Sequence, residues 1–445
     1  MGKGSYKKLQ GSQNFRQRLI LSTLSATPII IKDIRANDMF PGLRLHEVSL
    51  LRLLEKISDD CVVKINETGT MVQYKPGTLM GGRHLVHYCG ESRAIGYFLE
   101  PLLVLGLFSK KPLSIRLKGV VAFFSSFAKL FGRSACAYSL FSCLQEDVLI
   151  LSSELLVWGF VYCSLISLLA KAAIFPLCSY RSHLDANFTL MISALTYLKR
   201  ITNDSKDPSV DTFRSTTLPL LKQFGVPSEG LELKIESRGA PPHGGGDAVT
   251  WIDEGMVKRI RGVTFSTRVS SQFENTMIHA ARGIFNHLLP DVHIFTDHKA
   301  GPQAGNSPGY GISLVAETTS GCFISADTAV SHARVEDGGV EDEKAELMSP
   351  EDVGEQIASV LLQEIEQGGV VDTTHQGLLF LLCALCGQDV SKIRVGKLIP
   401  HGIEVLRLIR DFLGVKFVIK PDPSTGTVIL KCVGSGLKNL SRKSS

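Results

Sequence analysis

Residues 238–246 read RGAPPHGGG, and this stretch decides how the rest of the chain is interpreted. It follows Leu231 to Ile235, which the alternation of apolar and polar residues predicts as a strand. Three consecutive glycines are costly unless the backbone must turn tightly or approach another group closely. Successive glycine amides can also form a concavity that binds an anion such as phosphate. The predicted phosphate-binding residues in this loop are Arg238, His243, Gly244, Gly245 and Gly246.

Strands and helices alternate on both sides of this loop. Residues 15–57 predict a helix, a strand, a turn at Pro41-Gly42 and a second helix, and residues 62–74 predict a hairpin. The same alternation returns at 209–237 and again at 349–419. We therefore expect an α/β (α+β) protein in which three repeated α/β units form a large domain.

A smaller α/β block interrupts the repeats. The predicted organisation is 1–119 for the first repeat, 201–262 for the second repeat (truncated after Gly246), 263–331 for the inserted small domain, and 332–445 for the third repeat with a basic tail. Residues 336–349 are acidic and contain glycine, which is typical of a solvated linker.

The composition excludes several classes of protein. The chain has 445 residues, 44% of them hydrophobic and 20% charged, and a net charge of +5, which permits contact with RNA but does not require it. The ten cysteines show no paired CxxC spacing, so we expect neither a disulfide scaffold nor a metal site. Cys383 and Cys386 lie in an apolar run and are expected to be buried helical thiols. The first thirty residues lack the pattern of a signal peptide, which favours a reduced, intracellular compartment.

Residues 120–200 differ from the rest of the chain because they are hydrophobic and rich in Phe, Leu, Ser and Cys. A membrane span over 148–177 is one interpretation, but Glu154 and Lys171 would each cost about 2.5–3.5 kcal/mol at the centre of a bilayer. We expect no membrane span in a form that lacks this segment. An intron-like insertion is the favoured interpretation, and a genuine added domain is the alternative.

The glycine loop and other segments resemble the RNA 3'-terminal phosphate cyclase family along most of the chain outside 120–200. These segments include Ile34-Arg35-Ala36, Ile201-Thr202-Asn203-Asp204 and Ser307-Pro308-Gly309-Tyr310-Gly311. In the family, the strand ending near Gly119 runs directly into the Thr-Asn-Asp segment. The family also has a further strand after Val249, whose absence here leaves one sheet short. The resemblance implies a large domain of three repeats and a smaller inserted domain.

The residues that the resemblance associates with adenylate chemistry are altered. The family's Glu-Gly-Gly-Gly-Gln falls on Leu9-Gln10-Gly11-Ser12-Gln13, its Gln-His pair on His46-Glu47, and its Asp-Gln pair on Gly377-Leu378. His401 occupies the register of the nucleophilic histidine, but Gly402-Ile403-Glu404 replaces the threonines that follow it. The resemblance therefore favours a cyclase-like protein without catalysis or cofactor. The alternatives are an active cyclase that uses His401, ATP and Mg²⁺, or a precursor-rRNA endonuclease.

The cyclase-like branch of the family implies a role in small-subunit ribosomal RNA maturation. The expected partners are pre-ribosomal RNA and a GTPase of the small-subunit processome, and the expected location is the nucleolus within the nucleus. Basic side chains and free amides can hold phosphates without sequence preference. Besides the glycine loop, the candidate RNA-binding residues are Arg35, Lys258, Arg259, Arg261 and Arg268; a solvated charged surface is the alternative for the cluster.

Overall fold

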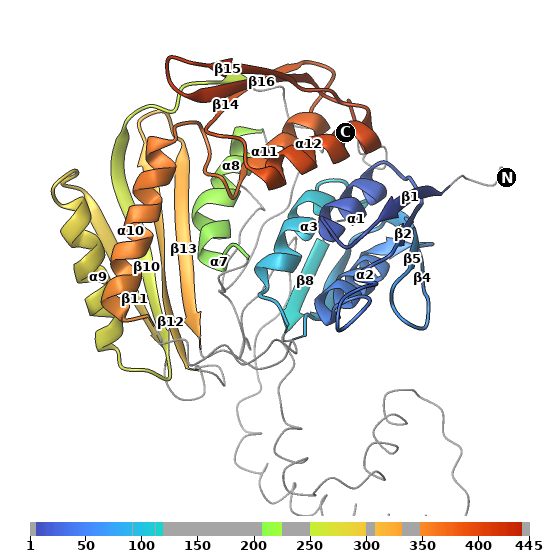
Figure 1. Cartoon of the computed structure of the whole chain (residues 1–445), viewed down its shortest axis with the longest axis horizontal. Helices are drawn as coiled ribbons and strands as arrows, with labels where there is room; N and C mark the ends of the chain where they lie inside the picture. Colours follow the sequence, from blue (N-terminus) through green and yellow to red (C-terminus); the bar gives the residue numbers. More distant parts are fainter. Residues whose placement is uncertain are drawn as a thin grey trace, which may run out of the picture. The chain divides into compact units, whose positions relative to one another are not determined.

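The N-terminal part of the chain folds as an open four-stranded sheet with helices packed against it (Figure 1). The computed structural model describes residues 6–90, 92–111, 113–118, 207–224, 250–299, 308–331 and 348–437. Strand β1 pairs in parallel with β2, and β5 and β4 follow antiparallel in the order β1-β2-β5-β4. A parallel pair needs a crossover connection, which α1 provides. The bounds are β1 (Lys7–Gln10), α1 (Phe15–Leu24), β2 (Ile29–Lys32), α2 (Leu45–Ile57), β4 (Val62–Ile65) and β5 (Val72–Lys75), with β3 (Ser58–Asp59) paired to β6 (Thr78–Leu79).

The C-terminal part repeats this topology. Strand β9 pairs in parallel with β14, and β16 and β15 follow antiparallel in the order β9-β14-β16-β15. Helix α11 precedes β14 and helix α12 precedes β15, as α1 and α2 precede β2 and β4. The two sheets therefore share one β-α-β-α-β-β order. The bounds are β9 (Thr250–Trp251), α11 (Gln376–Leu385), β14 (Val390–Val395), α12 (Pro400–Leu413), β15 (Val418–Asp422) and β16 (Thr427–Val433).

A third unit of the same kind begins between these two. Strand β7 pairs in parallel with β8, and helix α3 connects them. A second helical segment then follows in three parts, α7, the π-helical turn η1 and α8. This order matches the first four elements of the repeat. The bounds are β7 (Gly82–Tyr88), α3 (Gly96–Gly106), β8 (Leu113–Lys118), α7 (Val210–Thr212), η1 (Phe213–Thr217) and α8 (Leu218–Gln223).

The small domain lies between β9 and α11 in the chain. Its sheet has the order β11-β10-β12-β13, in which only β10 and β11 are parallel. Helices α9 and α10 cover one face of this sheet (Figure 1). The bounds are β10 (Val257–Thr267), α9 (Gln272–Phe285), β11 (Val292–Lys299), β12 (Gly309–Thr318), β13 (Phe323–Ser331) and α10 (Pro350–Glu366).

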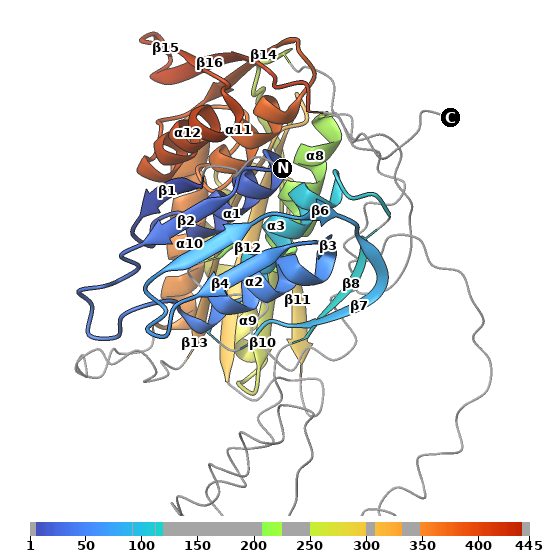
Figure 2. The same cartoon turned by 90° about the vertical axis from the view of Figure 1, so that its right-hand side faces the viewer.

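Two hydrophobic cores hold these elements together. One core joins the N-terminal and C-terminal sheets with α3, η1 and α8, and includes Phe98, Phe213 and Phe380. The other lies inside the small domain between its sheet and its two helices, and includes Phe285 and Leu361. The elements seen in Figure 2 therefore belong to one large domain with a continuous core and one small domain with a core of its own.

Buried carboxylates connect the small domain to the large one. Asp327 on β13 accepts hydrogen bonds from the Ser209 amide at 2.7 Å and from the Thr212 hydroxyl at 2.9 Å. Asp372 accepts hydrogen bonds from the backbone amide of Ser325 at 2.9 Å and from its hydroxyl at 2.8 Å. A buried polar group must be paired to be tolerated, so these four bonds fix where β13 meets the large domain.

The predicted fold class is confirmed, but the topology divides the chain at other points than expected. The second repeat begins at β7 rather than at residue 201, and the third begins at β9. The expected limit of the small domain at 331 leaves out α10, whose Val353 and Ile357 pack in that domain's core. The expected start at 263 divides β10. A helical pattern alone does not show which sheet the helix packs against.

The two thiols of the CxxC segment are buried, as expected, at Cys383 in α11 and at Cys386 immediately after it. The helices of the described residues include none with the length and apolar character needed to cross a membrane. The expectations for 120–200 and for the glycine loop at 238–246 concern residues outside those that the structure describes.

Candidate functional site

His401 lies in the first turn of α12, facing the start of α1. Pro400 opens the helix, since its fixed φ suits the first helical position. The His401 Nδ1 atom is 3.1 Å from the Oδ1 atom of Asn14, which precedes α1 with a left-handed φ of 52°. If Nδ1–H donates to Asn14, Nε2 keeps the lone pair. A Cβ atom built at Gly377 would lie 3.4 Å from this Nε2, so the helix α11 packs closely against the ring.

The electrostatic surroundings of His401 lower its pKa. Burial is the largest cause because it disfavours the charged imidazolium, and the Arg16 guanidinium acts in the same direction. The Glu100 carboxylate opposes both effects. These surroundings therefore favour the neutral form of the ring.

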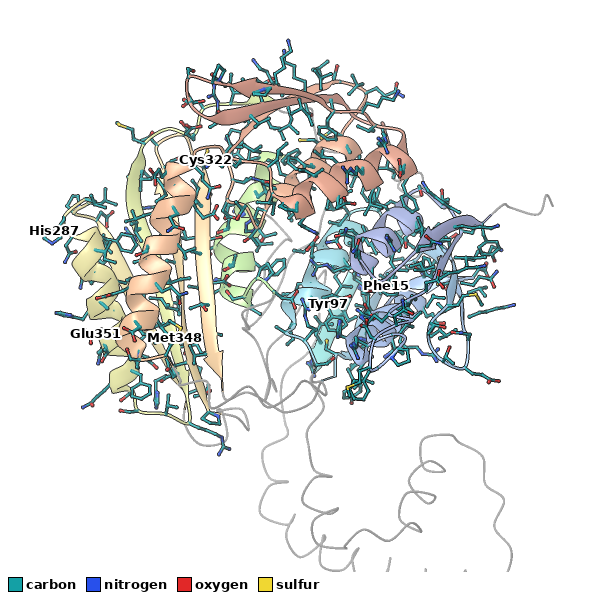
Figure 3. All side chains as sticks on the ribbon, viewed as in Figure 1. Phe15, Tyr97, His287, Cys322, Met348 and Glu351 are labelled. Carbon is teal, nitrogen blue, oxygen red and sulfur yellow. The ribbon has the colours of Figure 1, made fainter. Side chains whose placement is uncertain are left out.

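Two arginines and two carboxylates form a balanced cluster beside His401. Arg16 lies 2.5 Å from Glu100 and 3.6 Å from Asp207, and Arg93 makes a bidentate pair with Asp207 at 2.6 and 2.7 Å. Both guanidinium groups lie about 5 Å from the ring of Tyr97, which Figure 3 labels on α3. Cations over an aromatic face are stabilised by its quadrupole. The charges in this cluster cancel within the protein.

None of these residues was among the sequence-predicted site residues. Arg16, Glu100 and Asp207 come from α1, α3 and the segment before α7, so the large domain brings together positions that are far apart in the chain. Charged residues near the start of a helix are common on surfaces, and no local pattern in the sequence indicates that these would meet.

Arg35, a predicted phosphate-binding residue, is paired with Glu47. The two side chains make a bidentate pair at 2.7 and 2.8 Å, and the Glu47 side chain is only 3% exposed. Glu47 also accepts the backbone N–H of Arg44 at 2.8 Å and so caps α2. The carboxylate holds the pKa of Arg35 above its usual value by hydrogen bonding. A phosphate at Arg35 would have to compete with this internal pair, which weighs against the expected role.

His46, next to Glu47, packs on the same cluster. Its ring meets Tyr97 edge-on at 5.0 Å between centroids, and its Nδ1 atom is 3.3 Å from the Ser92 hydroxyl. Burial lowers the pKa of His46 to about 4. The altered pair His46-Glu47 therefore contributes one neutral ring and one carboxylate that is already paired.

The basic residues of β10 are also paired with carboxylates. Lys258 and Arg259 both lie 2.5 Å from Glu317, which leaves one net positive charge. Arg261 makes a bidentate pair with Asp291 at 2.8 and 3.0 Å. Arg268 follows the end of β10, and seven residues of extended strand separate it from Arg261 by about 23 Å. The structure therefore brings Lys258, Arg259 and Arg261 together at one end of β10 and places Arg268 beyond its other end. Arg238, His243, Gly244, Gly245 and Gly246 lie outside the described residues.

The described part of the chain contains no group of three or more His, Cys, Asp or Glu residues placed to hold a metal ion.

The sequence matches models of one protein family in two places. The family model of the RNA 3'-terminal phosphate cyclase matches residues 7–127. The model of the insert domain of the same cyclase matches residues 252–366, which include the whole small domain with α10. Together the two matches define a protein of the cyclase architecture with an inserted domain.

Full-length relatives identify the branch. A probable RNA 3'-terminal phosphate cyclase-like protein of Arabidopsis thaliana is 56% identical over 99% of each chain. The RNA 3'-terminal phosphate cyclase-like protein of Homo sapiens is 39% identical over 97% of this chain and 96% of its own. The rRNA processing protein rcl1 of Schizosaccharomyces pombe is 33% identical over 100% and 99%. The chain therefore belongs to the RNA 3'-terminal phosphate cyclase family, in its cyclase-like branch.

Proposed function

We propose that this chain is a non-catalytic factor in the processing of small-subunit pre-ribosomal RNA. The observation that carries the proposal is the similarity, over the whole length of both chains, to a fission yeast protein named for rRNA processing. The expected location is the nucleolus, because precursor ribosomal RNA is made and processed there. Pre-ribosomal RNA is the proposed nucleic-acid partner, and a GTPase of the small-subunit processome is the proposed protein partner.

The geometry around His401 supports the absence of adenylate chemistry. A nucleophilic histidine needs neighbouring groups that orient it and stabilise the charge that develops on the phosphate. Here the nearby arginines, Arg16 and Arg93, are paired with Glu100 and Asp207. Arg35 is paired with Glu47, at the position that the resemblance assigns to a histidine. Cationic groups that are already neutralised are poorly suited to bind a triphosphate.

The catalytic part of the proposal is tested by adenylation. The purified protein is incubated with radiolabelled ATP and Mg²⁺, and covalent AMP is measured after denaturing electrophoresis. We expect the wild-type signal to equal that of His401→Ala, with an authentic RNA 3'-phosphate cyclase as the positive control. A His401-dependent adduct would show an active cyclase, and cleavage of precursor RNA by the purified protein would show an endonuclease. Either result contradicts the non-catalytic proposal.

Exposed apolar side chains support a protein partner. Met39, Phe40 and Leu45, in and beside the turn that leads to α2, are 81%, 49% and 77% exposed. An exposed apolar patch on a folded protein often marks an interaction site. These side chains are the first candidates for contact with the GTPase.

The processing role is tested by replacement. Fission yeast cells depleted of rcl1 are supplied with this chain, and small-subunit precursor RNAs are measured by northern hybridisation. We expect the precursors to fall and the mature RNA to rise when the chain is present. The His401→Ala variant should restore processing as well as the wild type does. Accumulation of precursors at the level of the depleted cells, with the chain stably expressed, would contradict the proposed role.

A further inference from the structure

The two faces of the small-domain sheet differ in what covers them. Side chains that alternate along β10, such as Ile260 and Thr264, point toward α9 and α10 and are buried. The opposite face is covered at β12 and β13 by α7 and η1, where Thr212 hydrogen-bonds Asp327 and approaches Ser313. On that same face, β10 and β11 carry Arg261, Val263, Phe265, His293 and Phe295, which we call the β10–β11 face.

Aromatic side chains are accessible on the β10–β11 face. Phe295 is 61% exposed, which is unusual for a phenylalanine on a sheet, and it lies opposite Val263 in the register. Phe265 is half-buried on the neighbouring strand, two residues further along. A Cβ atom at Gly311 would come within 2.6 Å of the Phe265 ring, so the glycine allows this ring to lie over β12. The strand spacing and rise place the two phenylalanines about 8 Å apart.

The charged groups of this face nearly cancel. Lys258, Arg259, Arg261 and Lys299 pair with Glu317, Asp291 and Asp297, which leaves one net positive charge. Arg261 lies beside the aromatic pair and is held in place by Asp291. His293 also contacts Asp291, at 3.1 Å, and is opposite Arg261 in the register. This net charge is weakly favourable for a polyanion, and the aromatic rings supply the main contact.

We propose that the β10–β11 face is a stacking platform for unpaired bases of single-stranded RNA. This proposal rests on the proposed function and names the surface that meets the RNA. A four-stranded sheet backed by two helices, with aromatic side chains on its open face, is a known way of binding single strands. Every base has a π-face, so stacking on Phe295 and Phe265 tolerates many sequences. Arg261 would supply a further planar cation beside the rings.

The proposal is tested with the full chain and two RNA probes. One probe is a labelled oligouridylate of about 12 nucleotides, within the range of single-strand sites. The other is an RNA duplex of the same length, whose stacked bases cannot reach the rings. Dissociation constants are measured by fluorescence anisotropy at one fixed salt concentration, because phosphate contacts depend on salt. The variants are Phe295→Ala and Phe295→Trp, with Val418→Ala as the control at an exposed apolar side chain of β15.

We expect Phe295→Ala to weaken binding of the oligouridylate about tenfold, which corresponds to about 1.4 kcal/mol. Phe295→Trp should retain the affinity, and Val418→Ala should equal the wild type. Binding of the duplex should be unchanged in all variants. Circular dichroism checks that the variants are folded, which the exposure of Phe295 favours.

Three outcomes would contradict the proposal that the β10–β11 face stacks RNA bases. The first is equal binding of the oligouridylate by wild type and Phe295→Ala, which rejects this surface and leaves RNA binding elsewhere intact. The second is an equal loss for single-stranded and duplex probes, which indicates phosphate contact without stacking. The third is loss of a protein partner with unchanged RNA affinity in Phe295→Ala, which assigns the face to protein binding. If the wild type binds neither probe, the RNA-binding part of the proposed function fails as well.

Discussion

At the scale of single residues, positions that the resemblance associates with adenylate chemistry have structural partners. Glu47 holds Arg35 in a bidentate pair and caps α2 with the same carboxylate. His401 is placed by Asn14 and by the close approach of Gly377. The cluster around Tyr97 therefore contributes to stability, and its residues can be tested by unfolding.

The first such test is Glu47→Gln. Removing the charge leaves a partly buried guanidinium without its partner, and we expect the free energy of unfolding to fall by about 3 kcal/mol. Urea denaturation followed by circular dichroism measures the change. The control is Glu55→Gln, which breaks an exposed pair with Arg52 and should change stability by less than about 0.5 kcal/mol. Equal effects in the two variants would show that the Arg35 pair is not buried in solution.

The lowered pKa of His87 predicts that the stability of the protein depends on pH. Burial, with a smaller contribution from Lys56, lowers its pKa to about 4, below the value of about 6.5 in the unfolded chain. Between these values the unfolded chain binds a proton that the native protein does not, so stability falls as pH decreases from about 6.5 to 4. The loss from this residue approaches 3 kcal/mol at the acid end.

His87→Leu should remove that part of the pH dependence. Ser49→Ala, which deletes the hydroxyl 3.0 Å from the His87 ring but keeps the imidazole, should retain it. The measurement is the urea unfolding free energy at several pH values from 4 to 7. An unchanged slope in His87→Leu would mean that the ring is hydrated in the native state.

At the scale of elements, the small domain depends on two helices that pack very closely. A Cβ atom at Gly354 of α10 would lie 2.5 Å from the Met277 carbonyl oxygen and 3.0 Å from the Ala280 Cβ atom of α9. Gly354→Ala should therefore force the helices apart and destabilise the domain by about 2 kcal/mol. Gly283 of α9 has no atom within 4 Å of the same position.

Gly283→Ala is the matched control and should stabilise the protein by about 0.5–1 kcal/mol, because alanine favours a helix. Thermal unfolding by calorimetry compares the two variants. If both variants are less stable than the wild type, helix propensity and the free space around each glycine do not determine the stability of this pair of helices.

Helices and strands with strong periodicity could be predicted from the sequence, and their grouping could not. The apolar spacing within 15–57 predicts a second helix, which the structure shows as α2. The partner of α10 was not predictable, because its apolar face would fit either sheet. Among the candidate site residues, Arg261 and Lys258 both lie on β10, and their pairing with Asp291 and Glu317 depends on the registers of β10, β11 and β12.

At the scale of the whole molecule, the repeats explain how the two sides of the 120–200 segment come together. Lys118 at the end of β8 is opposite Tyr88 in the register, and Arg93, five residues after Tyr88, binds Asp207. A Cβ atom at Gly96 would also lie 2.1 Å from the Pro208 carbonyl oxygen. The described chain on one side of the segment therefore ends close to where it resumes on the other.

A form with Gly119 joined directly to Ile201 is therefore expected to fold. Between Lys118 and Asp207 it has eight Cα–Cα steps, which span at most about 27 Å, and the contacts through Tyr88 and Arg93 suggest a gap within that reach. Because this form loses a long apolar segment and keeps both the pairing of β8 with β7 and the Arg93–Asp207 pair, it should be more soluble than the full chain and at least as stable. Size-exclusion chromatography and urea unfolding of both forms measure this, with Asp207→Asn in the shortened form as a check that the Arg93 pair is retained. If the shortened form is less stable than the full chain, residues 120–200 contribute to the fold and are a genuine domain.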